Sequence, residues 1–113
     1  MEAAKTTLRL LEELRKIDPE MQLQTASVFL YVAHNEGITM KDLGDQLGLA
    51  QSSCSRNVAY FSKINRKHKE GYDLLVARED PAERRRKLVY LTPKGRRIVE
   101  SLGIVLDGYK GGS

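Results

Sequence analysis

The chain has 113 residues, of which 41% are hydrophobic and 30% are charged, and its formal net charge is +4. This length gives one domain with a single modest core, and this composition favours an ordered, soluble protein over a disordered one. No run of about 18 apolar residues is present, so no membrane-spanning segment is expected. Glu12, Glu13, Arg15 and Lys16 interrupt the N-terminal apolar positions, so we do not expect a signal peptide there.

Positive charge is concentrated in one part of the chain. Residues 62–97 contain 12 Lys and Arg against 5 Asp and Glu, a balance of +7, whereas the remaining residues contain 7 against 10, a balance of −3. Such a basic stretch is the electrostatic footprint expected of nucleic-acid binding. A membrane-surface role is not favoured, because residues 65–73 lack a helix face of bulky apolar side chains.

Two amphipathic helices are predicted before residue 37. Residues 3–17 carry a wide face of leucines, and Asp18 with Pro19 ends this helix. Residues 21–35 form the second helix, which Gly37 closes. The side chains of this second helix that we expect to face inward are Leu23, Ala26, Phe29, Leu30 and Ala33.

Residues 38–64 predict a helix-turn-helix. Thr39 and Asp42 match a capping box at the start of the first helix, and Gly48 ends that helix. The second helix runs from Gln51 to Ile64, with a buried stripe of Cys54, Val58, Phe61 and Ile64. Its outward side chains, which are small, polar or cationic, are Gln51, Ser52, Ser53, Ser55, Arg56 and Asn57. The second helix of such a pair can lie in the major groove of DNA.

A basic hairpin follows. Asp80 and Pro81 predict a turn, the four cations of residues 84–87 lie beyond it, and residues 88–91 predict a short strand. Thr92 before Pro93 predicts the start of a helix over residues 93–107. The expected fold is therefore mainly α with a small β-hairpin wing (α+β), a winged helix-turn-helix. Residues 1–109 form its single domain, helices 3–17 and 93–107 are dimerisation elements, and residues 110–113 are a flexible tail.

The chain resembles the MarR family of winged-helix transcriptional regulators over roughly residues 20–107. The resemblance is carried by a turn motif and a helix-start motif, namely Asp80, Pro81, Glu83, Arg84 and Arg85, followed by Leu91, Thr92 and Gly95. The segment from Leu49 to Arg56 is also similar to the recognition helix of the family. The link from Ile64 to Leu74 is longer and more basic than usual, and the sequence is a short form because it ends soon after Leu106. The resemblance implies a homodimer that binds DNA.

No constellation for catalysis or metal binding is found, so we expect a protein that is not an enzyme and has no cofactor. His34 and His68 have no Cys or carboxylate at a spacing that makes a site. Cys54 is the single cysteine and cannot form an intrachain disulfide, which is consistent with a cytoplasmic location. Its helical phase makes it a buried structural thiol rather than a redox switch.

The sequence therefore predicts a sequence-specific regulator that binds double-stranded DNA, a homodimeric repressor on a pseudo-palindromic operator. The expected DNA-binding residues are Thr39, Lys41, Gln51, Ser52, Ser53, Ser55, Arg56, Asn57, Lys63, Arg84, Arg85 and Arg86. Asp80 and Glu83 are expected to brace the arginines. Two alternatives stay open: a plasmid or phage accessory DNA-binding protein of replication, partition or packaging, and a winged-helix protein–protein adaptor. Whether a small-molecule effector exists is left open.

Overall fold

The computed structural model describes residues 1–63 and 70–111. Within these ranges the elements, in chain order, are α1 (Glu2–Arg15), α2 (Leu23–His34), β1 (Ile38–Thr39), α3 (Met40–Leu47), α4 (Gln51–Tyr60), β2 (Leu75–Asp80), β3 (Glu83–Leu91) and α5 (Pro93–Gly111). The strands form an antiparallel sheet in the order β1-β3-β2. The predicted winged helix-turn-helix is confirmed. The predictions for Ile64, His68 and residues 112–113 fall outside the described residues.

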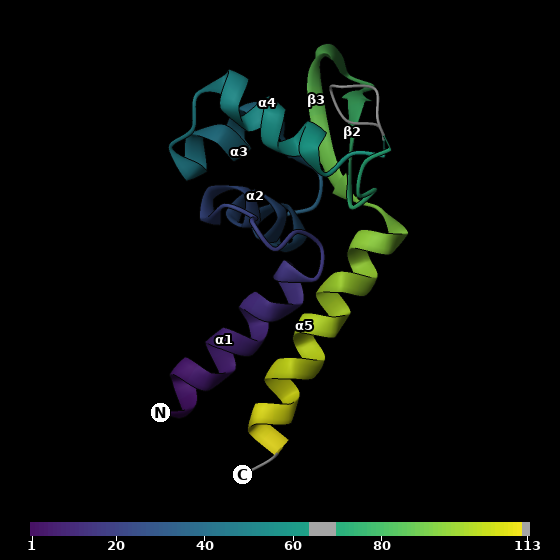
Figure 1. The fold of residues 1–113 in the computed structure, drawn as a ribbon. Helices are drawn as coiled ribbons and strands as arrows, with labels where there is room; N and C mark the ends of the chain where they lie inside the picture. Colours follow the sequence, from purple (N-terminus) through teal and green to yellow (C-terminus); the bar gives the residue numbers. More distant parts are fainter. Residues whose placement is uncertain (64–69, 112–113) are drawn as a thin grey trace.

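The molecule has a body and an arm (Figure 1). The body consists of α2, α3 and α4 with the β2–β3 hairpin, which stands beside α4. The arm consists of α1 and α5, which run side by side away from the body, so that the start of α1 and the end of α5 lie at its far end. The shape is accordingly elongated, with extents of 49 × 28 × 26 Å.

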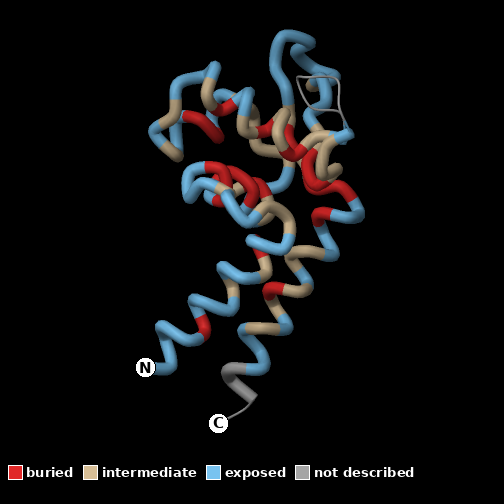
Figure 2. Tube along the Cα trace, in the orientation of Figure 1, coloured by how far each residue is buried: buried red, intermediate tan, exposed pale blue. Residues whose placement is uncertain are grey.

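The core lies in the body, where helices α2, α3 and α4 meet the sheet, as the buried segments of Figure 2 show. Its fully buried side chains are Val28, Phe29, Val32, Leu43, Cys54, Val58, Phe61, Leu74, Leu75 and Val89. Phe29 and Phe61 pack with ring centroids 5.5 Å apart, a favourable tilted arrangement. The arm buries far less: Leu14 and Leu102 are its buried large apolar side chains among the described residues.

The predicted inward face of α2 is partly wrong. Leu23 and Leu30 are 76% and 41% exposed, whereas Val28 and Val32 are fully buried. Ala26 and Phe29 do face the core, as predicted. Ala33 is half-buried against the core, and the contacts of α2 with α3, α4 and β3 also bury Val28 and Val32, which the prediction omitted. The two exposed leucines therefore form apolar spots on the surface of the body.

A backbone junction at Leu74 joins α4, the wing and the arm. The Phe61 carbonyl, one residue after α4 ends, accepts hydrogen bonds from the N–H groups of Leu74 and Leu75 at 2.7 and 3.1 Å. Thr92, at the start of α5, donates its N–H to the Leu74 carbonyl at 3.0 Å and its hydroxyl to the Asp73 carbonyl at 2.5 Å. The same hydroxyl caps α5, because it accepts a hydrogen bond from the N–H of Gly95 at 3.0 Å.

Several element ends differ from those predicted. Helix α4 ends at Tyr60 instead of Ile64, because the Phe61 carbonyl turns to the start of β2. Strand β3 begins at Glu83 instead of Leu88, so the arginines belong to the strand. Helix α5 continues to Gly111, beyond the predicted end at 107.

The Leu74 junction gives a stability prediction with a control in the same helix. A Cβ on Gly95 would lie 2.1 Å from the Leu74 carbonyl oxygen, a backbone atom that cannot move without breaking the junction. We expect Gly95→Ala to lower the free energy of unfolding by about 1–3 kcal/mol, as overpacking does. Gly103→Ala meets no atom within 4 Å, and it should stabilise α5 by up to about 1 kcal/mol. Urea unfolding of both variants checks this, and a neutral Gly95→Ala would contradict it.

Candidate nucleic-acid interface

Helices α3 and α4 form the predicted helix-turn-helix, and the turn depends on two glycines. Gly48 caps α3 in the left-handed conformation, with φ 66° and ψ 32°. Gly44 lies where α3 crosses α4, and a Cβ there would lie 3.2 Å from the Leu49 carbonyl oxygen and 3.5 Å from the Cys54 Cβ. The close approach at Gly44 therefore sets how near α4 lies to α3.

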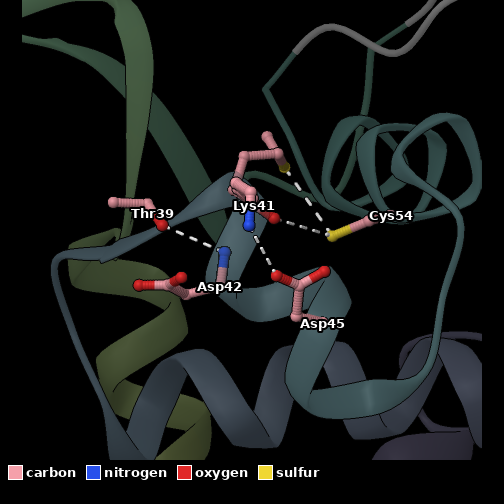
Figure 3. A network of polar contacts seen from close by, with 6 residues as sticks. Thr39, Lys41, Asp42, Asp45 and Cys54 are labelled. Carbon is pink, nitrogen blue, oxygen red and sulfur yellow. Dashed lines mark hydrogen bonds and ion pairs between the residues drawn. The ribbon is translucent and has the colours of Figure 1, made fainter.

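The first residues of α3 form a polar network (Figure 3). Thr39 accepts a hydrogen bond from the Asp42 N–H at 3.0 Å, which confirms the predicted cap. Lys41 and Asp45 form an exposed ion pair of 2.9 Å, and this hydrogen bond raises the pKa of Lys41. The ammonium group of Lys41 is thus cationic and partly neutralised, and the Thr39 oxygen is already occupied by its capping role.

Cys54 lies behind α4, as the sequence predicts. It is fully buried, and its thiol lies 3.6 Å from the Met40 carbonyl oxygen and 3.8 Å from the Met40 Sδ (Figure 3). Burial raises the pKa of the Cys54 thiol, so it stays protonated and unreactive. The side chain acts as a small hydrophobic group between α3 and α4.

The outward face of α4 carries most of the predicted contacts. Gln51, Ser52, Ser55 and Arg56 are exposed, and Ser53 is half-buried. The N-cap residue Ala50 provides no side-chain cap, so the first N–H groups of the helix are not occupied by a cap. Short polar side chains at the start of a helix can approach base edges and phosphates closely.

Asn57 is less exposed than predicted. Its Oδ1 accepts a hydrogen bond from the Thr25 hydroxyl at 2.6 Å, and its Nδ2 donates to the Ser53 carbonyl at 2.9 Å. Thr25 is buried on α2, so the side chain of Asn57 faces α2 instead of solvent. This pairing of residues 32 positions apart was not visible in the sequence.

The arginines of the wing occupy an irregularity in the hairpin. Glu79 pairs with Lys87 and Asp80 pairs with Glu83, so residues 84–86 of β3 have no partner positions on β2. These residues are Arg84, Arg85 and Arg86, and all three are exposed. A bulge bends a strand and changes the direction of its side chains. The run of cations is therefore displayed by the bulge at the end of the wing.

The three arginines differ in their partners. The Arg86 Nε lies 2.9 Å from the Asp80 Oδ2, and Asp80 is only 16% exposed. This ion pair spans the bulge and confirms Asp80 as a brace. Glu83 accepts instead from the backbone N–H of Arg85 at 3.3 Å. Within the described ranges, the guanidinium groups of Arg84 and Arg85 form no ion pair, so their charges are available.

A groove separates α3 and α4 from the wing. Its volume is about 340 Å³, and it is lined by Met40, Lys41, Gln51, Ser55, Glu83, Arg85, Arg86 and Lys87. Five predicted site residues from three elements therefore converge here: Lys41, Gln51, Ser55, Arg85 and Arg86. Lys87 was missing from the predicted set, although it continues the run of arginines that should have suggested it. Four cations facing one groove, with a single carboxylate among its lining residues, favour a polyanion.

The other predicted residues lie elsewhere. Ser53, Arg56 and Asn57 line a hollow of about 420 Å³ on the opposite flank of α4, beside Asp18 and Thr25. We call this space the rear hollow. Lys63 lies past the end of α4, near the base of the wing, where it borders a different depression with Leu75 and Pro93. The predicted set therefore surrounds α4 and is not confined to the groove.

Tyr60 and Asp18 close one end of the rear hollow. The Tyr60 hydroxyl donates to Asp18 Oδ2, and the Glu20 N–H donates to Asp18 Oδ1 at 2.9 Å. The hydrogen bond from Tyr60 and then that from Glu20 lower the pKa of Asp18. Burial, followed by the bond to Asp18, raises the pKa of Tyr60, which therefore remains a hydrogen-bond donor.

The lowered pKa of Asp18 predicts part of the acid sensitivity. A carboxylate whose pKa is lower in the folded state stabilises above its unfolded pKa, about 4, and loses this contribution as the pH falls through the folded pKa. Asp18→Asn should therefore reduce the fall in the free energy of unfolding below about pH 4. Urea unfolding at a series of pH values measures this. Glu20→Gln removes a neighbouring carboxylate as a control, and an equal reduction in both variants would refute the assignment to Asp18.

The described residues contain no group of three or more His, Cys, Asp or Glu side chains that could hold a metal ion. None of the helices in this part of the chain is both long and apolar enough to cross a membrane.

No family model and no curated protein matches this chain in sequence, but solved structures match its fold. MepR of S. aureus, in a complex with DNA, has a TM-score of 0.76 at 17% identity, over 96% of this chain and 81% of that chain. The PcaV transcriptional regulator of Streptomyces coelicolor has a TM-score of 0.63 at 20% identity, over 96% and 74%. MarR has a TM-score of 0.65 at 16% identity, over 88% and 65%. The chain has the winged helix-turn-helix fold of the MarR-family transcriptional regulators.

Proposed function

We propose that this protein is a sequence-specific transcriptional regulator that binds double-stranded DNA, and that it acts as a homodimeric repressor on a pseudo-palindromic operator. The observation that carries the proposal is the groove, where the start of α4 and the arginines of the wing face each other. The likeness to MepR, whose structure holds DNA, supports it. Repression would follow from occlusion of the polymerase.

In this proposal α4 enters the major groove. Gln51, Ser52 and Ser55 contact base edges or phosphates, and Arg56 is the candidate for a specific contact with guanine. Lys41 and Lys63, both exposed, contribute to phosphate binding. Thr39 and Asn57 support this surface, because their side chains already make hydrogen bonds within the protein. The Ser53 hydroxyl accepts a hydrogen bond from Arg56 at 3.4 Å and supports that side chain.

The wing follows the DNA backbone beside the site of α4. Arg84 and Arg85 approach the flanking minor groove, where A·T-rich narrowing strengthens the negative potential. Arg86 keeps its ion pair with Asp80 and holds the bulge in shape. Of these three arginines, Arg84 and Arg85 therefore contact DNA, and Arg86 holds the bulge that positions them.

The arm is the proposed dimer interface. Leu8 and Leu11 of α1 are 57% and 39% exposed, and Ile104 and Leu106 of α5 are 71% and 42% exposed. Burial of such side chains against a second copy would remove apolar surface from water. A two-fold axis through the arms would present two α4 helices to half-sites about 34 Å apart, one turn of DNA.

The function is tested first by selection of bound sites from random duplexes. A regulator of this kind enriches a two-fold symmetric sequence, and its affinity for that sequence falls steeply with salt. A footprint over tandem repeats would favour an accessory replication or partition protein. Failure to bind any duplex at low salt would favour a protein–protein adaptor.

The wing gives a quantitative prediction. The double variant Arg84→Ala/Arg85→Ala should weaken binding to selected and random duplexes alike. It should also reduce the slope of log affinity against log salt by about 1–2 units per protomer, as expected for lost phosphate contacts. Lys5→Ala/Arg9→Ala removes the same net charge from exposed positions on the arm and serves as the control. Equal slopes for the two double variants would contradict a contact between the wing and DNA.

The arm gives a prediction about assembly. Leu8→Glu/Ile104→Glu should convert a dimer to a monomer, because the two carboxylates would be buried without partners at the interface. Leu23→Glu changes a more exposed leucine on α2, outside the arm, and should leave the dimer intact. Sedimentation velocity at several concentrations distinguishes the two. A wild-type protein that is monomeric at every concentration would exclude the dimer.

A further inference from the structure

Two side chains on one flank of α4 form hydrogen bonds with α2 and with the turn before α2. Asn57 and Tyr60 are three residues apart and so lie on the same side of the helix. Asn57 accepts from Thr25 of α2 at 2.6 Å, and Tyr60 donates to Asp18 in the turn between α1 and α2. This flank faces the rear hollow, whereas Gln51 and Ser55 face the groove on the other flank.

Asp18 is held firmly enough to act as an anchor. Its N–H donates to the Leu14 carbonyl at 3.3 Å, and its own carbonyl accepts from the Met21 N–H at 3.1 Å. Its side chain accepts from the Glu20 N–H through Oδ1 and from Tyr60 through Oδ2. Leu14 is buried where the arm meets the body. The carboxylate is thus fixed to the end of α1 by backbone hydrogen bonds on both sides.

Tyr60 is held from the other side by aromatic packing. Its ring lies edge-on to Phe61 with centroids 4.9 Å apart, and it is tilted against Tyr72 at 5.1 Å. The ring is half-buried, and its hydroxyl reaches Asp18 beside the rear hollow. The hydroxyl is therefore committed to the protein and lies away from the groove.

These contacts differ in kind from the packing beneath α4. The buried stripe of Cys54, Val58 and Phe61 holds the helix against the core by apolar contact, which is not directional. Apolar contact alone permits small rotations of a helix about its axis. A hydrogen bond weakens steeply when its angle changes, so a bond at the edge of the helix resists such rotation. Sequence-specific recognition requires that α4 keeps one rotation about its axis, because its side chains must lie at hydrogen-bonding distance from the base edges.

We propose that Tyr60 and Asp18 are positioning residues, whose hydrogen bond fixes the rotation of α4 and so sets the sequence specificity of DNA binding without contact to DNA. The proposal rests on the DNA-binding function proposed above. In this proposal the turn between α1 and α2, which contains Asp18, also contributes to sequence specificity. Loss of this hydrogen bond would leave the phosphate contacts nearly intact. Long cationic side chains can still reach a phosphate after a small rotation of α4, whereas the shorter side chains that contact base edges cannot keep their hydrogen bonds.

The test compares affinities for the selected duplex and for random duplexes. Tyr60→Phe and Asp18→Ala should each lower the ratio of the two affinities about fivefold, the factor that corresponds to one net hydrogen bond. Affinity for random duplexes should change little. The double variant should lower the ratio by no more than the single variant with the larger effect, because both substitutions remove the same bond.

Tyr31→Phe is the matched control. Tyr31 is half-buried on α2, and its hydroxyl makes no hydrogen bond within the described ranges, so this variant should keep the wild-type ratio. Thermal unfolding shows that each variant is folded at the assay temperature. A purely structural role would lower the melting temperature while leaving the ratio unchanged.

Two results would overturn the proposal. One is an unchanged ratio in Tyr60→Phe and Asp18→Ala, and the other is an equal fall in both affinities. Selective duplex binding by the wild-type protein tests the DNA-binding function separately from the role of Tyr60 and Asp18. If wild-type protein binds no duplex selectively, the DNA-binding function has failed. If it does bind selectively, the variants decide the role of Tyr60 and Asp18.

Discussion

The backbone junction at Leu74 is the constraint on which the recognition surface depends. Three parts of the chain meet there: the end of α4 through the Phe61 carbonyl, the start of β2, and the start of α5 through Thr92. Gly95 allows α5 to approach the Leu74 carbonyl so closely that no side chain fits between them. Because α4 and the wing share this anchor, the angle between them, and hence the groove, is set by main-chain hydrogen bonds.

The junction gives a physical reason for the helix-start motif formed by Leu91, Thr92 and Gly95. Leu91 is buried at the end of β3, Thr92 bonds to both Asp73 and Leu74, and Gly95 leaves room for the Leu74 carbonyl. Asp73 itself has a positive φ of 58°, a conformation uncommon outside glycine but tolerated by Asp and Asn. The spacing in the motif therefore reflects one close contact between a strand and a helix.

Local chemistry in the sequence was sufficient to predict the helix-turn-helix and the starts of its helices. The capping contacts of Thr39, Gly48 and Thr92 each lie within four residues, so these caps follow from local rules. The bonds of Thr92 to Asp73 and Leu74 are long-range, and the sequence did not indicate them. The burial of Cys54 followed from helical spacing. The buried face of α2 did not follow, because apolar side chains occur all around this helix, and the contacts with α3, α4 and β3 determine which of them are buried.

The candidate site was predictable in its residue types but not in its arrangement. The irregular register of the wing places three arginines in a bulge, a feature that no alternation of residues indicates. The bonds of Asn57 to Thr25 and of Tyr60 to Asp18 join residues 32 and 42 positions apart. Such pairs arise from the packing of α4 on α2 and on the turn before it. The sequence therefore showed Asn57 only as an outward polar residue of the recognition helix.

The bulge of the wing also bears on how this protein avoids aggregation. Among the described residues, strand β2 pairs with β3 on one side and is the edge of the sheet on the other, where a strand from another molecule could add. The bulge breaks the regular ladder near the end of this edge, and Arg78, Glu79 and the three arginines surround it with exposed charge. Bent, charged edges resist the addition of further strands. Substitutions that flatten or neutralise the wing would therefore expose a template for β-aggregation, whatever their effect on ligand binding.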